Sequence, residues 1–513
     1  MTTSHPVDLA VASHVAFAAP SSHDLPGFPP LLDDVLRRTP RRYRAPALPA
    51  TWEEARAAGT ATALAAAIEQ ARTALASGNA PADDARTLFV DALARLIGHA
   101  MRPLTAQGKE GDGDGDAGGD NNEGGPAPAG GGDPAFQAMV LRHRSPVVRE
   151  YASLSAHAER DRRAVRTAVN ALAHPKKTQR RAAGPTRDAL LALHAAAGAG
   201  DWARVSDVLV PLHDGADTHA EPSLHRGLAR LIDEPALTRL RRLDALSPDV
   251  LVARYRALWE RRGPIAGSEQ AAARGAGAQQ RGDAVEVLAV QALDGLVDRM
   301  NAAAGETRYR IVASLRIPPS FPGDAQRAKS EWDVALLKRS DADGDWDLCL
   351  LVEAKASPDA ATTDLPKLLR GLRLLAQADI DTTYAFTSTD GEVRLRGASL
   401  SALPTEEGDL ARAVLYCCDG LEDRTPRLLS AASRMQLLCA EASLDFAAAL
   451  EDGASADPSR LIPVWRLLLE APAFTSVLRQ YETLRAVREL MVHPGDLQAA
   501  VVTTTPSTLP DSR

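Results

Sequence analysis

The chain has 513 residues, of which 45% are hydrophobic and 25% are charged. This composition is typical of a soluble globular protein, and the length suffices for two to four domains. Four cysteines without CxxC spacing exclude a disulfide framework and a zinc ribbon. No run of about 18 apolar residues and no basic-then-apolar leader is present, so we expect a cytoplasmic protein without a membrane partner.

Most of the formal net charge of −8 is concentrated in one segment. Residues 105–134 hold seven acids and one lysine, which leaves a net charge of −2 for the remaining chain. A near-neutral body neither excludes a nucleic-acid ligand nor carries the basic signature of a dedicated binder. Residues 107–134 are also rich in glycine and poor in apolar groups, which predicts a disordered linker.

Helical periodicity dominates the sequence on both sides of this linker. In chain order the predicted regions are a proline-rich, largely irregular segment (1–50), a helical region (51–106), the linker (107–134), a second helical region (135–261), a glycine-rich break (262–282), an α/β domain (282–405), a C-terminal helical region (406–495) and a disordered tail (496–513). The predicted fold is therefore multidomain and mainly α-helical, with one α/β domain.

The α/β segment has the pattern helix, three strands, helix, strand. The predicted elements are a helix over 283–300, strands over 309–317, 331–338 and 346–354, a helix over 364–377 and a strand over 382–387. Turn residues at 341–345 join the second and third strands as a hairpin. This order predicts a three-layer α/β unit.

Three polar residues interrupt these strands. Asp333 lies inside the second strand, and Glu353 and Lys355 end the third, two residues apart and therefore on one face. The hairpin brings the two strands side by side. Two carboxylates and an ammonium group at one sheet end predict a Mg²⁺ site, with Mn²⁺ as the alternative ion. Such an ion polarises a phosphoryl group, and lysine supports the attacking water.

This arrangement resembles the PD-(D/E)XK nuclease superfamily, whose fold is that of the restriction endonucleases. The matching residues are Asp333 and the Glu353-Ala354-Lys355 motif, and the resemblance covers about residues 282–396. It implies that Glu286 in the preceding helix joins Asp333 and Glu353 as a metal ligand. The proline that often precedes the aspartate is missing here. An acid-x-Lys motif alone carries little weight, but Lys355 is the one lysine with an acid two positions earlier.

Each of these residues also has a plainer interpretation. Asp333 could be a solvated strand-edge acid, and Glu353 with Lys355 a surface ion pair of little energetic value. Glu286 could lie on the wet side of its helix. Glu331, two residues before Asp333, is either a second acid of the site or an exposed strand start.

Two groups of basic residues are candidates for contact with a nucleic-acid backbone. Lys367, Arg370 and Arg373 recur on one side of the helix after the motif. Lys176 and Lys177 belong to a second basic patch. A solvated helix face and a charged interhelical loop are the alternatives for the two groups.

The leading hypothesis is a Mg²⁺-dependent nuclease that acts on DNA in preference to RNA, with a role in defence or DNA repair. The alternative is a catalytically idle nuclease fold that binds protein partners through its helical regions. A third hypothesis is a helical structural protein with a coincidental motif, which requires Asp333 and Glu353 to lie far apart.

Overall fold

The computed structural model describes residues 29–103, 132–215, 221–261, 269–324, 328–341, 344–420, 428–454 and 457–504. The predicted linker up to residue 131, the N-terminal segment up to residue 28 and the tail from residue 505 lie outside the described residues. The chain forms two compact units. The first comprises Met1–Leu96, Ile265–Leu437 and Asp457–Arg513, and the second comprises Ile97–Pro264 and Leu438–Ala456.

Most of the described chain is helical, with a smaller mixed sheet, which confirms the mainly α-helical prediction. In the described part no single helix is long and apolar enough to cross a membrane. One bent pair of helical segments, Pro458–Glu470 with Pro472–Leu478, has sufficient length and apolar composition when taken together.

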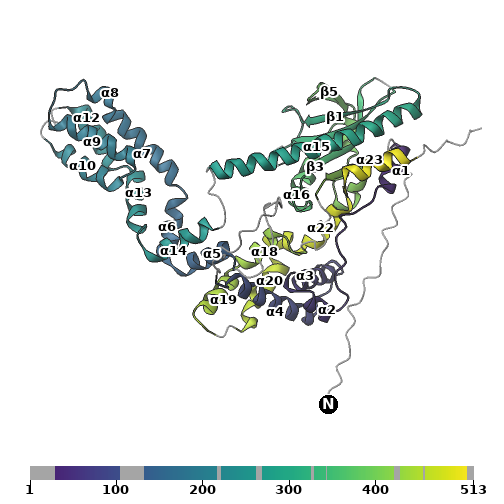
Figure 1. Cartoon of the computed structure of the whole chain (residues 1–513), viewed down its shortest axis with the longest axis horizontal. Helices are drawn as coiled ribbons and strands as arrows, with labels where there is room; N and C mark the ends of the chain where they lie inside the picture. Colours follow the sequence, from purple (N-terminus) through teal and green to yellow (C-terminus); the bar gives the residue numbers. More distant parts are fainter. Residues whose placement is uncertain are drawn as a thin grey trace, which may run out of the picture. The chain divides into compact units, whose positions relative to one another are not determined.

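The second unit is built from helices (Figure 1). They are α5 (Pro134–Arg144), α6 (Pro146–Ser155), α7 (Ala158–Ala173), α8 (Pro175–Thr178), α9 (Pro185–Ala199), α10 (Trp202–Asp214), α12 (Pro222–Ile232), α13 (Pro235–Leu246), α14 (Val250–Glu260) and α19 (Glu441–Glu451). The apolar faces of α7, α9, α10, α12 and α13 pack around the buried Trp202, Val165 and Leu240, and α5, α6 and α14 form a smaller cluster of their own. Asp161 is buried on α7 and accepts both hydrogen bonds of a bidentate pair with Arg239 on α13, each 2.7 Å long.

The first unit holds the sheet and the remaining helices. The N-terminal and C-terminal helices of this unit are α1 (Pro30–Arg38), α2 (Trp52–Ala57), α3 (Thr60–Ala76), α4 (Asp83–Ala100, which ends in the second unit), α18 (Ala431–Leu438), α20 (Ile462–Glu470), α21 (Thr475–Leu478), α22 (Gln480–Glu489) and α23 (Pro494–Thr503). Helix α15 (Glu269–Ala304) precedes the first strand, and α16 (Pro358–Leu375) and α17 (Gly397–Ser401) lie between strands in the sequence.

Seven strands form one mixed sheet: β1 (Tyr309–Arg316), β2 (Glu331–Arg339), β3 (Trp346–Lys355), β4 (Thr383–Ser388), β5 (Gly391–Arg396), β6 (Val414–Cys418) and β7 (Met491–Val492). The first three form an antiparallel meander, β6 joins β3 in parallel, and β7 joins β6 in parallel. The β4–β5 hairpin connects the ends of β1 and β3 by single residue pairs.

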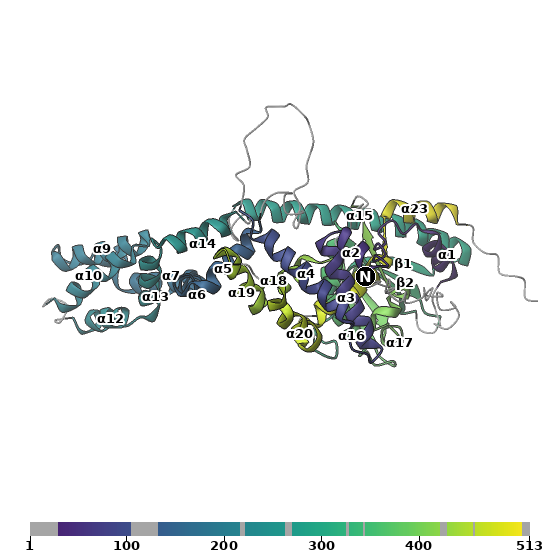
Figure 2. The same cartoon turned by 90° about the horizontal axis from the view of Figure 1, so that it is seen from below.

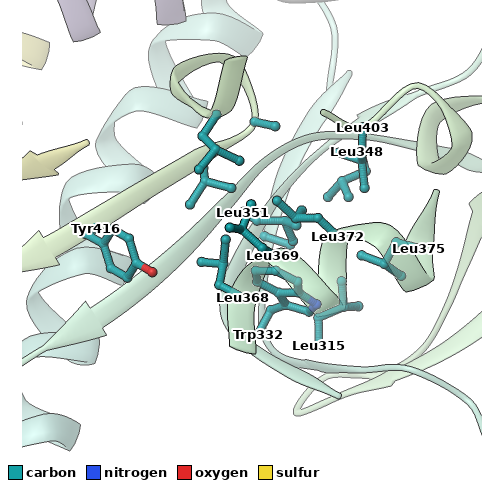
Figure 3. Packing of buried hydrophobic residues seen from close by; sticks show 14 of the residues in the cluster. Leu315, Trp332, Leu348, Leu351, Leu368, Leu369, Leu372, Leu375, Leu403 and Tyr416 are labelled. Carbon is teal, nitrogen blue, oxygen red and sulfur yellow. The ribbon is translucent and has the colours of Figure 1, made fainter. Parts of the chain in front are cut away.

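Helices pack on both faces of this sheet (Figure 2). On one face α15, α23 and α1 bury apolar side chains against Val334, Leu350 and Val352. On the other, α16 and α22 pack against a cluster that includes Trp332 and Leu351 (Figure 3). Leu348 and Leu351 of β3 face one core, and Cys349, Leu350 and Val352 face the other. The strand is therefore a continuous apolar run from Leu348 to Val352.

The predicted strands over 309–317, 331–338, 346–354 and 382–387 match β1 to β4 within one residue at each end. Three further strands were not predicted, and two of them lie in the region expected to be helical (406–495). The five residues of β6 are all buried, and periodicity alone cannot separate such a short apolar run from a buried helix segment. The two residues of β7 are too few to form a pattern.

Two predicted breaks are wrong in part. The break over 262–282 is helical from Glu269, because α15 continues through Gly275, Gly277 and Gly282. Each glycine destabilises a helix by about 1 kcal/mol relative to alanine, and the neighbouring alanine and glutamine residues, which favour helices, offset this loss. The tail predicted over 496–513 is helical to Thr503, since α23 buries apolar residues against α15.

Gly371 on α16 is predicted to be a position where alanine destabilises the protein. A Cβ atom there would lie 2.8 Å from the Cβ of Lys329 and 3.2 Å from the Trp332 ring. Helix propensity alone would favour alanine by about 1 kcal/mol, whereas the overpacking should cost about 1–3 kcal/mol. We expect Gly371→Ala to lower the free energy of unfolding, measured by urea denaturation.

The matched control for this change is Gly295→Ala on α15. The added Cβ there would meet its nearest neighbour, Val501, at 3.9 Å, which is an ordinary contact. This control should be neutral or stabilising. Equal effects of the two substitutions would contradict the packing argument.

Candidate functional site

The candidate site lies where the regular alternation of side chains is interrupted in β1 and β2. Trp332 and Ala335 are three residues apart yet face the same core, so the alternation of side chains slips by one residue between them. The slip lies opposite Ser314 of β1, which adopts a left-handed backbone conformation with φ of 51°. Asp333 occupies the step, and its Oδ2 accepts a hydrogen bond of 2.8 Å from the backbone N–H of Ala354 on β3.

Glu353 lies beside Asp333 on the neighbouring strand. The pairing of β2 with β3 runs through Val334 and Val352, and continuing this register by one step places Asp333 opposite Glu353. On its other side Glu353 pairs with Tyr416 of β6. Asp333 and Glu353 therefore lie on adjacent strands. The hypothesis of a coincidental motif requires them to lie far apart, so this arrangement speaks against it.

Glu353 is fully buried, and two ammonium groups contact the same carboxylate oxygen. Lys355 Nζ lies 2.8 Å from Glu353 Oε2, and Lys329 Nζ lies 2.7 Å from it. The other oxygen, Oε1, is buried and has no hydrogen-bond partner within the described residues. An unsatisfied buried carboxylate oxygen is costly, so Oε1 is the atom most in need of a ligand.

Two further polar residues face this group from α16 and β6. Asp364 Oδ2 lies 3.5 Å from Lys355 Nζ. It is therefore within about 6.3 Å of Glu353 Oε2, because both oxygens approach the same nitrogen. The Tyr416 hydroxyl is buried with no hydrogen-bond partner in the described part (Figure 3). Burial raises the pKa of Tyr416, and the carboxylates of Asp364, Glu353 and Asp333 raise it further.

Glu286 approaches from the opposite face of the sheet, on α15. Burial raises the pKa of its carboxyl group, and the negative charge of Asp333 adds to this rise. Asp333 raises the pKa of Glu353 in the same way. The negative charge of Asp333 thus acts on both Glu286 and Glu353.

The charges of this group suit a divalent cation. Glu353 and Asp364 pair with two ammonium groups, and Asp333 acts electrostatically on Glu353 and on Glu286, so acidic groups outnumber the two lysines here. Oxygen donors of this kind, with the free Glu353 Oε1 among them, are the ligands that Mg²⁺ prefers. In the described residues no three His, Cys, Asp or Glu side chains are already gathered in an arrangement that could hold a metal ion.

Burial and pairing act in opposite directions on the two central residues. Burial raises the pKa of Glu353 to about 7, and Asp333 adds to the rise, while Lys355 and Lys329 oppose it. Burial alone would lower the pKa of Lys355, but the carboxylates of Glu353, Asp364 and Asp333 outweigh it and raise the pKa. Lys355 is therefore a firmly charged group, whereas Glu353 exchanges its proton near neutral pH.

The raised pKa of Glu353 predicts a pH dependence of stability. Because the pKa of Glu353 in the folded chain lies above the ordinary glutamate value of 4.5, the folded chain holds an extra proton between pH about 4.5 and 7. Metal-free protein should lose stability on the order of 1–3 kcal/mol as pH rises through this window. Urea denaturation in EDTA at pH 5 and pH 7.5 measures the loss. In Glu353→Gln, which has no proton to lose, this part of the loss should disappear; an unchanged pH profile would contradict the assignment.

The predicted nucleic-acid residues lie on two different units. Lys367, Arg370 and Arg373 are exposed on α16, the helix that also carries Asp364. Arg373 lies 3.5 Å from Glu406. Lys176 and Lys177 are exposed on α8 of the second unit. Glu331 forms a half-exposed ion pair of 3.0 Å with Arg316, which fits a strand start better than a ligand.

Three residues of the group were not predicted from the sequence: Lys329, Asp364 and Tyr416. Tyr416 lies on a strand that the sequence did not reveal. Lys329 lies in the loop before β2, with no local signal except that lysine is rare in this chain. Asp364 shares one side of α16 with Lys367, one turn later, and that spacing is the one signal that could have drawn attention to it.

The site thus combines Asp333, Glu353 and Lys355 on adjoining strands with a second lysine and two further carboxylates. Comparisons of the chain with protein-family models, with curated proteins and with solved structures found no match.

Proposed function

We propose that the first unit is a Mg²⁺-dependent nuclease of the PD-(D/E)XK kind, with a restriction endonuclease-like fold, that hydrolyses phosphodiester bonds in DNA rather than RNA. The observation that carries the proposal is the arrangement of Asp333 opposite Glu353, with Lys355 Nζ 2.8 Å from the Glu353 carboxylate in a buried site. An ammonium group held between buried carboxylates is well placed to stabilise negative charge that develops on a phosphoryl group.

In this proposal the acidic residues bind the metal ion and Lys355 acts on the water and the phosphate. Glu286, Asp333 and Glu353 hold the ion, which when bound supplies Lewis-acid assistance to hydrolysis. Lys355, kept charged by Glu353 and Asp364, orients the attacking water and offsets charge on phosphorus. Hydrolysis adds water across one P–O bond, and the departing oxygen takes up a proton.

A catalytically idle fold is the second candidate. The observation that favours it is that Lys329 and Lys355 already neutralise Glu353 Oε2 without a metal ion. In this case the helices of the second unit provide the contacts to a protein partner, and the carboxylate cluster is a structural ion-pair network.

Incubation of the purified full chain with supercoiled plasmid, single-stranded DNA and RNA separates these candidates. Cleavage of DNA in Mg²⁺ or Mn²⁺ that stops in EDTA is the result expected of the nuclease. Asp333→Ala should abolish it, whereas Asp294→Ala, an exposed acid on α15, should not. Cleavage that persists in Asp333→Ala would show that another site or a contaminant is responsible.

A further inference from the structure

Lys329 is the least expected member of the site. It lies in the loop before β2, two residues from the start of the strand, and its side chain is 9% exposed. Its ammonium group forms the shorter of the two ion pairs to Glu353 Oε2, at 2.7 Å. A lysine is seldom buried unless a partner compensates its charge, so this placement needs a cause.

The surrounding residues hold Lys329 in this position. Its Nζ lies 5.6 Å from the centre of the Trp332 ring, within the range of a cation–π interaction. The absence of a side chain at Gly371 allows α16 to approach the Lys329 backbone, since an added Cβ would lie 3.0 Å from the Lys329 carbonyl oxygen. The loop is therefore packed against α16 and β2 in one position.

The position of Lys329 decides which oxygen of Glu353 stays free. With Lys329 and Lys355 both on Oε2, the carboxylate is fixed in an orientation that leaves Oε1 without a hydrogen-bond partner in the described part. Residues that fix the orientation of a metal ligand through a hydrogen bond or ion pair contribute to metal affinity even though they do not contact the ion.

We propose that Lys329 is a positioning residue of this site, which holds Glu353 with Oε1 open to a divalent cation. The inference rests on the proposed function and adds a residue on which metal affinity depends. It gives the two lysines different roles: Lys355 orients the attacking water, whereas Lys329 acts by holding the Glu353 carboxylate in position.

Calorimetric titration of Mg²⁺ and Mn²⁺ into wild type and Lys329→Met tests the proposal without an activity assay. The expected result is a dissociation constant about 10–100-fold higher in the variant, the range found for residues that orient metal ligands. Lys338→Met, five residues beyond Asp333 on the same strand, is the matched control and should bind as wild type does. A merely structural role would lower the melting temperature and leave the dissociation constant unchanged.

Gly371→Ala provides a second variant that keeps every charge. The added methyl group displaces the Lys329 loop, so metal affinity should again fall, and this variant decides the matter if Lys329→Met does not fold. Equal or tighter metal binding in the folded variants would overturn the positioning role while leaving the nuclease proposal intact. A wild-type chain that binds neither ion would overturn both.

Discussion

Lys355→Ala is expected to lower the rate of metal-dependent DNA cleavage by about 10²–10³-fold, the usual effect of removing one group that stabilises transition-state charge. The Lys355 ammonium group contacts Glu353 Oε2 at 2.8 Å and lies 3.5 Å from Asp364, so it is fixed and charged before substrate arrives. Alanine removes the charge without adding bulk. Single-turnover cleavage of plasmid DNA, followed by gel electrophoresis, measures the loss.

The protein should stay folded in this variant, because Lys329 still forms an ion pair of 2.7 Å with Glu353 Oε2. Circular dichroism and thermal melting check this directly. Lys338→Ala is the control for the loss of a lysine elsewhere on the sheet. Full cleavage activity in Lys355→Ala would remove this lysine from the mechanism.

Glu353→Gln is expected to abolish metal binding and cleavage while making the metal-free protein more stable at pH 8. The pKa of Glu353 is raised to about 7, so at pH 8 the folded chain carries a buried charge that the fold disfavours. A neutral side chain of the same shape should raise the free energy of unfolding on the order of 1–3 kcal/mol. A substitution that raises stability and abolishes function is typical of active-site residues, because active sites often sacrifice stability for activity.

Urea denaturation and calorimetric Mg²⁺ titration on the same preparation measure both effects. At pH 5, where wild-type Glu353 is protonated in the folded chain, the difference in stability should shrink. A variant that is much less stable than wild type at both pH values would instead identify Glu353 as a structural ion-pair residue. Retained metal binding would exclude it as a ligand.

The sequence predicted the central strands well because each carries its own evidence. β2 and β3 are largely apolar runs bounded by turn residues, and the polar Asp333, Glu353 and Lys355 stand out against them; β1 is rich in residues that favour strands. Strand pairing within a hairpin is local, so the approach of Asp333 to Glu353 could be predicted from spacing alone.

The rest of the site depends on contacts between distant segments. Tyr416 becomes a neighbour of Glu353 because β6 pairs with β3 in parallel, and a parallel pair needs a long crossover that leaves no local pattern. Lys329 is a site residue because Gly371, far along the chain, permits its loop to pack. The slip in alternation at Ser314 and Asp333 likewise follows from the pairing of two strands.

Calorimetric titration of Mg²⁺ into wild type and Asp333→Ala tests the central claim most directly. Asp333 lies opposite Glu353 by strand register and its charge acts on Glu286, so its loss should remove the central ligand of the proposed cation site. We predict binding in wild type that disappears in the variant, together with DNA cleavage by wild type alone. Equal binding in both proteins, or none in wild type, would contradict the account.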